Sequence, residues 1–276
     1  MKKRVRKILM VILAVVFLWS SVMVLREQRA YREGEEIYAL AEQLAAAPAE
    51  RPSADPPPPP SESTAPAAPD ASAPSEAPTP PAESTAPAGP LAEVELDSLR
   101  AVSKAVTGWI SVPDTKLSYP LVQGTDNDYY LNHAWNGSRT SVGSIFLDHR
   151  STPDMTDFHT LIYGHRMKNG SMFAALKYYA DAAYRAAHPY VYIKTAECVR
   201  QYAVFAAYEA PVRSVTYQLS FADDAQRQEL IDFALTRSVI ACGITPAVTD
   251  RIVTLSTCTG QGYDTRWVVQ AVEIAP

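Results

Sequence analysis

One long hydrophobic run stands near the start of the chain. Residues 8–25 are uncharged and almost wholly apolar, just long enough for a helix to cross a bilayer. Lysines and arginines crowd residues 1–7, so the positive-inside rule predicts a cytoplasmic tail there, a single-pass anchor over 8–25 and an extracellular remainder. A cleaved signal peptide is the alternative, but it would need a shorter apolar core and a small-residue cleavage site.

Two segments of contrasting composition follow the apolar run. Residues 26–47 are charged and rich in Ala, Glu and Leu, which predicts that a helix continues out of the membrane. Residues 48–90 hold 15 of the 22 prolines and show no hydrophobic periodicity, which is typical of a disordered spacer. At ~3.1 Å per residue this tract could reach up to ~130 Å. We therefore expect the folded domain to occupy 91–276.

Short hydrophobic runs with β-branched and aromatic residues recur through this domain and predict strands. They cover 108–112, 117–122, 144–147, 160–163, 190–193, 202–208, 252–258 and 266–272. Two segments have helical spacing instead, a short one over 94–107 and a longer one over 222–239. This pattern predicts a mainly β fold with added helices.

The strand that ends at Cys258 carries candidate chemistry. Alternation puts Cys258 on a polar face with Thr254 and Ser256, so the opposite, mainly apolar face can pack while the thiol faces a cleft. Glycines predict a turn over 259–265, and antiparallel pairing about it places Cys258 opposite Arg266. Cross-strand neighbours have Cβ atoms ~5 Å apart, so the guanidinium could stabilise a thiolate or an oxyanion.

Charge and cysteine count narrow the function. The 276 residues carry a formal net charge of -5, so nothing suggests nucleic acid as a partner. The three cysteines leave at least one free thiol outside the membrane. Cys198 and Cys242 could pair in an oxidising exterior, but buried core positions suit them as well. Cys258 is the one left for chemistry.

Plainer interpretations stay open for single residues. A lone cysteine is usually a small buried hydrophobic residue, and a lone arginine after a turn is usually a solvated charge. Asp126, Asp128 and His133 could form an oxygen-rich cluster, but their spacing matches no known calcium loop. We therefore expect no metal and no other cofactor.

Three motifs together resemble the sortase family, and specifically class B sortases. They are Thr254–Cys258 with Arg266, Tyr163–Met167 around His165, and the pair 126–133 and 143–148. The resemblance runs from about Gly108 to Ile274 in the expected order. It implies a closed, eight-stranded β-barrel with an N-terminal helix and a long helix before the cysteine strand. The Cys and Arg would lie on neighbouring strands, with the His on a loop at the same mouth.

The resemblance implies a cysteine transpeptidase at the surface of a Gram-positive cell. Cys258 would be the nucleophile, His165 the proton carrier, and Arg266 the cation that binds the oxyanion or the substrate threonine. The acyl donor would be a surface protein with a C-terminal sorting signal, cleaved at a Thr-Gly-like bond. The acceptor would be an amine of a peptidoglycan precursor or cross-bridge. We expect a monomer.

The resemblance also implies positions in a substrate groove. Matching motifs place Asn127, Leu131, Tyr163 and Ser256 there. The choice of His165 as the proton carrier has local support as well, because an apolar strand ends just before it. The intervening Gly164 suits a sharply turning backbone, which would put the imidazole at the rim of the barrel.

Other functions remain alternatives. A pilin-polymerising sortase would use the same three groups. An L,D-transpeptidase would also combine Cys, His and Arg at the wall, but it needs a Ser-x-Gly-Cys-type motif, and Thr257 replaces that glycine. A papain-like hydrolase needs its Cys before its His, whereas His165 precedes Cys258. An inactive wall-tethered binding module is the non-enzymatic alternative.

Overall fold

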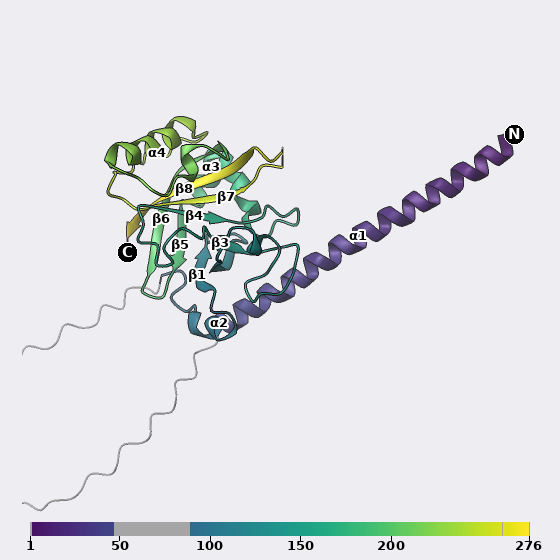
Figure 1. The fold of residues 1–276 in the computed structure, drawn as a ribbon, viewed down its shortest axis with the longest axis horizontal. Coiled ribbons are helices and arrows are strands. Elements are labelled where there is room, and N and C mark those ends of the chain that lie inside the picture. Colours follow the sequence, from purple (N-terminus) through teal and green to yellow (C-terminus); the bar gives the residue numbers. More distant parts are fainter. Residues whose placement is uncertain (1, 47–88, 261, 276) are drawn as a thin grey trace, which may run out of the picture.

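The computed structural model describes residues 2–46, 89–260 and 262–275 (Figure 1). Its strands are β1 (Val106–Ser111), β2 (Ser118–Gln123), β3 (Ile145–Leu147), β4 (His159–Tyr163), β5 (Tyr190–Lys194), β6 (Val199–Pro211), β7 (Ile252–Cys258) and β8 (Thr265–Ala275). They close into a barrel in the order β1-β2-β3-β4-β7-β8-β6-β5. The predicted mainly β fold and its eight-stranded closure are confirmed.

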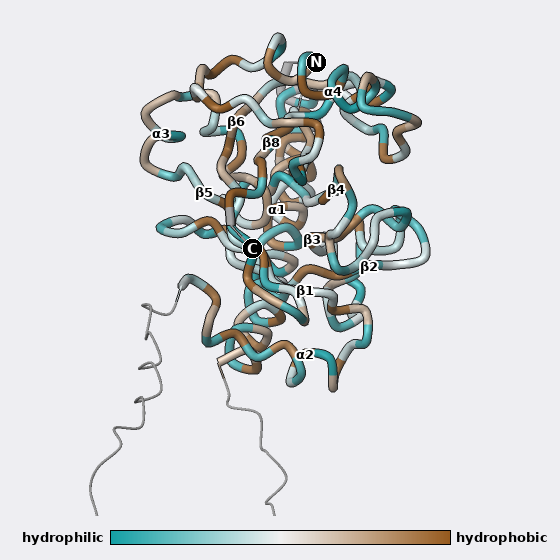
Figure 2. The backbone as a smooth tube through the Cα atoms, turned by 90° about the vertical axis from the view of Figure 1, so that its left-hand side faces the viewer, coloured by the Kyte–Doolittle hydropathy of each residue, from teal (hydrophilic) through white to brown (hydrophobic). Residues whose placement is uncertain are grey.

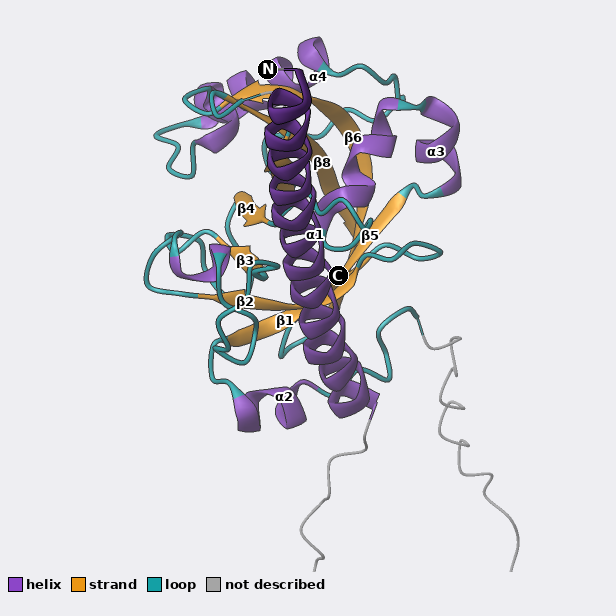
Figure 3. Cartoon of the chain, turned by 90° about the vertical axis from the view of Figure 1, so that its right-hand side faces the viewer, coloured by secondary structure: helices purple, strands orange, loops and turns teal. Residues whose placement is uncertain are grey.

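Helices surround the barrel. They are α1 (Lys2–Ala46), α2 (Leu96–Val102), α3 (Ala182–Ala187) and α4 (Asp224–Arg237), with 3-10 turns η1 (Tyr129–Leu131), η2 (Phe173–Ala180) and η3 (Val215–Tyr217). Figure 3 shows α2 and α4 at opposite ends of the barrel. The helix predicted over 94–107 is shorter than expected because β1 already begins at Val106.

The long helix before the cysteine strand is confirmed as α4, and its start has a local cause. The Asp223 carboxylate accepts a hydrogen bond from the Gln226 backbone N–H at 3.0 Å, while the Gln226 side chain accepts one from the Ala222 N–H at 3.0 Å. The first bond satisfies an N–H group that the first helical turn leaves unpaired, and the second fixes the chain just before the helix. Local side chains therefore determine where α4 begins.

Apolar residues fill the barrel and also cover part of its outside. Figure 2 shows hydrophobic residues gathered along strands such as β6 and β8. A second buried cluster joins Ile231 and Ala234 of α4 to Phe205 of β6 and Val268 of β8. Because α4 covers these strands from outside, they are buried on both faces and read as nearly continuous hydrophobic runs.

Helix α1 has an exposed first half and a last third packed on the barrel. Large apolar side chains from Leu9 (55% exposed) to Leu25 (54%) are in the open, whereas Tyr38, Ala41 and Ala45 are buried in the main core. Leu9–Ala46 is the one helix among the described residues long and apolar enough to cross a membrane. The helix predicted beyond the apolar run is present, continuous with it.

The predicted Pro-rich spacer over 48–90 lies outside the described residues except for its last two. The chain on either side of it is in contact, because the Glu95 N–H donates a hydrogen bond to the Ala45 carbonyl at 2.7 Å. The domain boundary at Leu91 stays a prediction. Three residues before it, Tyr38, Ala41 and Ala45, nevertheless share a core with the barrel.

Closure of the barrel between β1 and β5 generates a stability prediction. A Cβ at Gly108 would lie 2.2 Å from the Lys194 backbone oxygen, and backbone in a closed sheet cannot move aside cheaply. We expect Gly108→Ala to lower the free energy of unfolding by about 1–3 kcal/mol, the usual cost of overpacking. Each kcal/mol corresponds to about 2–4 °C in Tm for a domain of this size.

Thermal unfolding of the purified protein measures this effect. Gly89→Ala is the matched control, because a Cβ there has no heavy atom within 4 Å. Equal melting temperatures for Gly108→Ala and Gly89→Ala would contradict the described β1–β5 closure.

Candidate active site

The parallel pairing of β4 with β7 brings the predicted nucleophile and proton carrier together. Tyr163 is the register partner of Ser256, and the Gly164 N–H continues the ladder by donating to the Ser256 carbonyl at 3.2 Å. The Thr257 hydroxyl donates to the Gly164 carbonyl at 2.7 Å. His165 and Cys258 each lie two residues beyond the Tyr163–Ser256 pair, so they meet at one mouth of the barrel.

Gly164 serves close packing rather than the sharp turn that the sequence suggested. It is absent from the described residues with positive φ. A Cβ at Gly164 would instead lie 2.8 Å from the ring of Phe173, which is fully buried. The glycine therefore lets the loop after β4 that carries His165, here called the histidine loop, lie directly on η2.

The His165 imidazole joins the Cys258 thiol to a fixed carbonyl. Its Nε2 lies 2.6 Å from the Leu131 carbonyl oxygen, and the ring also hydrogen-bonds to the Cys258 thiol. A carbonyl oxygen can only accept, so Nε2 carries a hydrogen and Nδ1 is the nitrogen that can exchange a proton with sulfur. Cys258 is exposed at the end of β7, so substrate can reach the thiol.

Electrostatics favour a thiolate and an imidazolium. The hydrogen bond with His165 lowers the pKa of the Cys258 thiol against the opposing effect of burial, and the charges of Arg266 and Arg166 lower it further. The same hydrogen bond raises the pKa of His165 against burial, and the Leu131 carbonyl raises it as well. A cysteine with these neighbours is a stronger nucleophile at neutral pH than an isolated thiol.

Arg266 lies directly opposite Cys258 in the β7–β8 pairing, so the predicted register is confirmed. Its Nη1 donates to the carbonyls of Tyr263 at 2.8 Å and Thr265 at 2.9 Å. These bonds orient the guanidinium. Both use Nη1, so Nε and Nη2 are the donors that can turn toward a substrate oxygen. Positive φ at Gly262 permits the turn that returns the chain.

Two residues join this site without having been predicted. Arg166 donates from Nη1 to the Thr259 carbonyl at 2.6 Å, which ties the histidine loop to the loop after Cys258. The Tyr217 hydroxyl lies 3.0 Å from the Ser256 hydroxyl. Arg166 could have been suspected from its place beside His165. Tyr217 arrives on η3, and only the tertiary fold brings it to β7.

The polar face of β7 is not an open cleft, so that prediction is wrong away from its end. Thr254 is fully buried, and its hydroxyl meets Nε2 of His159 at 2.7 Å and Nε2 of Gln270 at 2.8 Å. Burial lowers the pKa of His159 to about 4, so its imidazole is neutral at physiological pH. Only the Cys258 end of the face opens to solvent.

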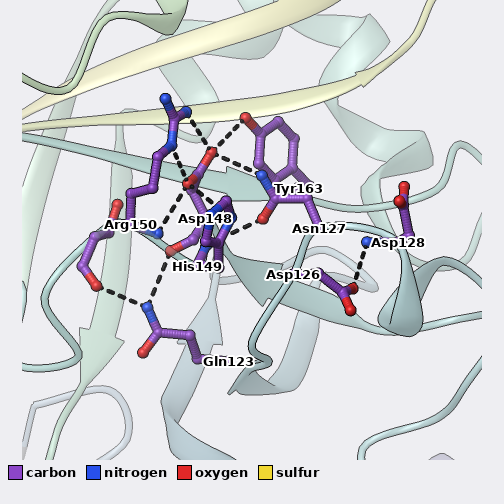
Figure 4. A network of polar contacts seen from close by, with 9 residues as sticks. Gln123, Asp126, Asn127, Asp128, Asp148, His149, Arg150 and Tyr163 are labelled. Carbon is purple, nitrogen blue, oxygen red and sulfur yellow. Dashed lines mark hydrogen bonds and ion pairs between the residues drawn. The ribbon is translucent and has the colours of Figure 1, made fainter.

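The predicted groove residues Asn127 and Tyr163 converge on one buried carboxylate (Figure 4). Asn127 Nδ2 and the Tyr163 hydroxyl donate to Asp148 Oδ2 at 2.9 and 3.0 Å. Arg150 donates to the same carboxylate through Nε and Nη2, both at 2.8 Å. Burial would raise the pKa of Asp148, but these hydrogen bonds hold it well below its usual range. The network therefore keeps Asp148 charged beside Asn127 and Tyr163.

The other two predicted groove residues differ in accessibility. The Leu131 side chain is 40% exposed, beside the carbonyl that holds His165. Ser256 is only 2% exposed and is paired with Tyr217. Leu131 is therefore accessible from solvent, whereas Ser256 is covered and its hydroxyl is bonded to Tyr217.

A nucleophilic cysteine, a hydrogen-bonded histidine and an arginine at one barrel mouth define a cysteine acyltransferase site. A model of the Sortase domain family matches residues 110–274, so the chain belongs to the sortase family. Sortase B of Listeria monocytogenes is 36% identical over 178 residues, which cover 64% of this chain and 72% of that protein. This likeness makes the chain a class B sortase, a cysteine transpeptidase.

Solved structures agree with the assignment. The Staphylococcus aureus sortase B–substrate complex is 32% identical, with a TM-score of 0.61 over 64% of this chain and 83% of that one. A structure of sortase B complexed with triglycine is 31% identical, with a TM-score of 0.62 over 65% and 85%. The alternatives of an L,D-transpeptidase and a papain-like hydrolase are therefore not favoured.

The thiolate prediction can be tested through pH-dependent alkylation. Iodoacetamide reacts with the thiolate, so the reaction rate rises as pH passes upward through the pKa of Cys258. Because that pKa is lowered, the rise should come below pH 9.0, the ordinary value. His165→Ala removes the largest lowering contribution and leaves burial, so its rise should shift to higher pH.

Intact-mass detection in a Cys198→Ala, Cys242→Ala background keeps the signal specific to Cys258. His165→Gln is the companion variant, because it keeps a polar side chain but cannot carry the imidazolium charge. If His165→Ala and the parent had the same alkylation midpoint, the described hydrogen bond would not control the thiol.

Proposed function

We propose that this class B sortase cleaves a C-terminal sorting signal of exported proteins at a Thr-Gly-like bond and transfers the acyl group to a cell-wall amine. The observation that carries the proposal is the exposed Cys258 thiol, hydrogen-bonded to His165 and paired across the hairpin with Arg266. No other partner class is needed, and the enzyme acts as a monomer without a cofactor.

The first half-reaction forms a thioester. The Cys258 thiolate attacks the threonine carbonyl carbon, so a C–S bond forms and the carbonyl oxygen becomes an oxyanion. Arg266 and backbone N–H groups near the thiol stabilise that oxyanion. When the C–N bond breaks, the His165 imidazolium gives its proton to the departing amine. The peptide beyond the cleavage point leaves, and the acyl group stays on sulfur.

The second half-reaction consumes the thioester. A free amine attacks its carbonyl carbon, neutral His165 accepts the amine proton, and collapse of the intermediate breaks the C–S bond. An amide joins the client to the acceptor, and the thiolate–imidazolium pair is restored. The sortase B complexes with substrate and with triglycine support a peptide donor and an amine acceptor of this kind.

Recognition of the donor is assigned to the groove beside the dyad. Leu131 offers an exposed apolar contact, and the Asp148 network holds Asn127 and Tyr163 in place. Ser256, through Tyr217, completes the wall nearest the thiol. We propose sorting signals of the Asn-Pro-x-Thr or Leu/Ser-Pro-x-Thr-Gly type as the peptides to examine. Clients in haem uptake, pilus assembly or general surface display would all present such signals.

Membrane attachment is the remaining part of the proposal. The exposed apolar half of α1 suits a single-pass anchor with a cytoplasmic N-terminus and an extracellular barrel. Glu27, two residues past the apolar run, lies 3.2 Å from Lys168 of the histidine loop. Figure 1 shows the β7–β8 loop on the side of the barrel toward which the free half of α1 extends. The active-site mouth would therefore face the bilayer, where newly exported clients emerge.

The nucleophile is tested by peptide cleavage and transfer to triglycine. Cys258→Ala should abolish both reactions, because no thioester can form. Cys198→Ala and Cys242→Ala are the matched controls, since both thiols are free and the His165 imidazole bonds to Cys258 instead. Both variants should leave turnover nearly intact. Residual transfer by Cys258→Ala at a comparable rate would rule out the covalent route.

The role of Arg266 is tested by Arg266→Lys, which keeps the charge but loses the planar fork. If the guanidinium binds the oxyanion, kcat/KM should fall by about 10²–10³-fold, the effect of losing one oxyanion donor. Single-turnover acylation and melting curves should be measured together. An unchanged acylation rate would remove Arg266 from the catalytic groups, and a large fall in Tm would make it a structural residue of the hairpin.

A further inference from the structure

The last third of α1 touches the two segments that enclose His165. The Tyr38 hydroxyl donates to the Gly143 carbonyl at 2.6 Å and lies 3.3 Å from the Ser144 hydroxyl. Trp135, which follows η1, donates from Nε1 to the Ile37 carbonyl at 3.1 Å. One turn of α1 is therefore hydrogen-bonded both to Trp135, just after η1, and to the 142–144 segment. The bonded residues are about 100 positions apart in the sequence.

Gly143 is the point where this contact reaches the dyad. A Cβ there would lie 2.9 Å from Cδ2 of His165 and 2.7 Å from the Leu131 carbonyl oxygen. That carbonyl is the acceptor that holds Nε2 of His165 at 2.6 Å. The Gly143 backbone, with φ of +63°, thus abuts both the imidazole ring and the group that orients it. A small shift of Gly143 would change both contacts at once.

The contact is buried and closely fitted. Tyr38 is 7% exposed, and its ring packs edge-on against Tyr119 with centroids 5.2 Å apart. One turn earlier, a Cβ at Gly34 would lie only 2.6 Å from Cγ2 of Val142. Glycine at this position lets α1 lie directly on the 142–144 segment. Gly in a helix interior costs about 1 kcal/mol relative to Ala, so close approach of α1 has a cost in helix stability.

We propose that α1 is part of the active-site scaffold and that Tyr38 is a positioning residue for His165, acting through Gly143. Tyr38 touches no reacting atom. Its hydroxyl holds the Gly143 carbonyl, and Gly143 in turn restricts the positions of the His165 imidazole and the Leu131 carbonyl. His165 thereby keeps its proton and its hydrogen bond to Cys258. The inference rests on the His165–Cys258 chemistry proposed above.

This arrangement ties the segments on either side of the predicted spacer to the catalytic domain. The hydrogen bond from the Glu95 N–H to the Ala45 carbonyl joins the end of α1 to the residue just before α2. The barrel would therefore stay against α1 instead of extending away from the membrane. A protein that begins at Leu91 would lack Tyr38 and should be impaired even when folded.

The test uses full-length protein in detergent and a sorting-signal peptide that wild type cleaves. Tyr38→Phe keeps the ring packing and removes only the hydroxyl. Loss of one hydrogen bond from the scaffold should lower kcat/KM by about three- to tenfold. Because the Leu131 contact raises the pKa of His165, loosening it should move the alkaline limb of the pH–rate profile to lower pH. The alkylation midpoint of Cys258 should move to higher pH.

A second pair of variants tells a positioning role of α1 from a general loss of stability. Gly34→Ala places a methyl against Val142, so α1 should lift and the pH profile should narrow as for Tyr38→Phe. Adding Val142→Ala removes the obstructing methyl groups and should restore both rate and profile. Glu36→Ala, on the exposed side of α1, is the matched control and should behave as wild type. If α1 were only a tether, Gly34→Ala would leave the rate and the pH profile unchanged and could stabilise the helix.

Each outcome decides the proposal. Wild-type rates and profiles in both Tyr38→Phe and Gly34→Ala would overturn it and leave the proposed transpeptidation intact. Lower rates with unchanged pH limbs, or no rescue by Val142→Ala, would make α1 a stabilising element only, which also overturns the positioning role. If wild type itself formed no thioester with any peptide of the Asn-Pro-x-Thr or Leu/Ser-Pro-x-Thr-Gly type, the proposed function would fail instead, independently of α1.

Discussion

The active site depends on the parallel pairing of β4 with β7. In an antiparallel pair the ends of the two strands would point to opposite mouths, and His165 could not meet Cys258. The Tyr163–Ser256 register also fixes which faces the two side chains take, since a slip of one residue would turn either of them away. The Thr257–Gly164 hydrogen bond stabilises this register directly beside Cys258 and His165.

Around that pairing, the neighbouring elements supply charge and rigidity. The β7–β8 hairpin brings a guanidinium to the thiol, while the Leu131 carbonyl and Gly143 confine the imidazole. The dyad thus has a cation on one side and a fixed acceptor on the other. Both stabilise the ion pair, and neither competes with substrate for sulfur. These two neighbours explain why the Cys258 thiol can be exposed and still have a lowered pKa.

Local sequence predicted the elements well and the tertiary contacts poorly. The hairpin from Cys258 to Arg266 follows from a glycine-rich turn between two β-branched runs, and the predicted strand ends agree closely with β7. The closed barrel and the choice of His165 came from family resemblance. Burial of Thr254 could not be predicted, because His159 and Gln270 reach it from distant segments. The contact of Tyr38 with the active-site segment could not be predicted for the same reason, since its partner lies 105 residues away.

The most direct measurement of the central claim is the intact mass of the enzyme during reaction with a sorting-signal peptide. If β4 and β7 assemble a working dyad, the mass should rise by that of the acyl fragment. Peptide mapping should locate the adduct on Cys258, and triglycine should remove it with formation of the amide product. An adduct on another residue, or cleavage and transfer with no adduct under rapid quenching, would contradict the account.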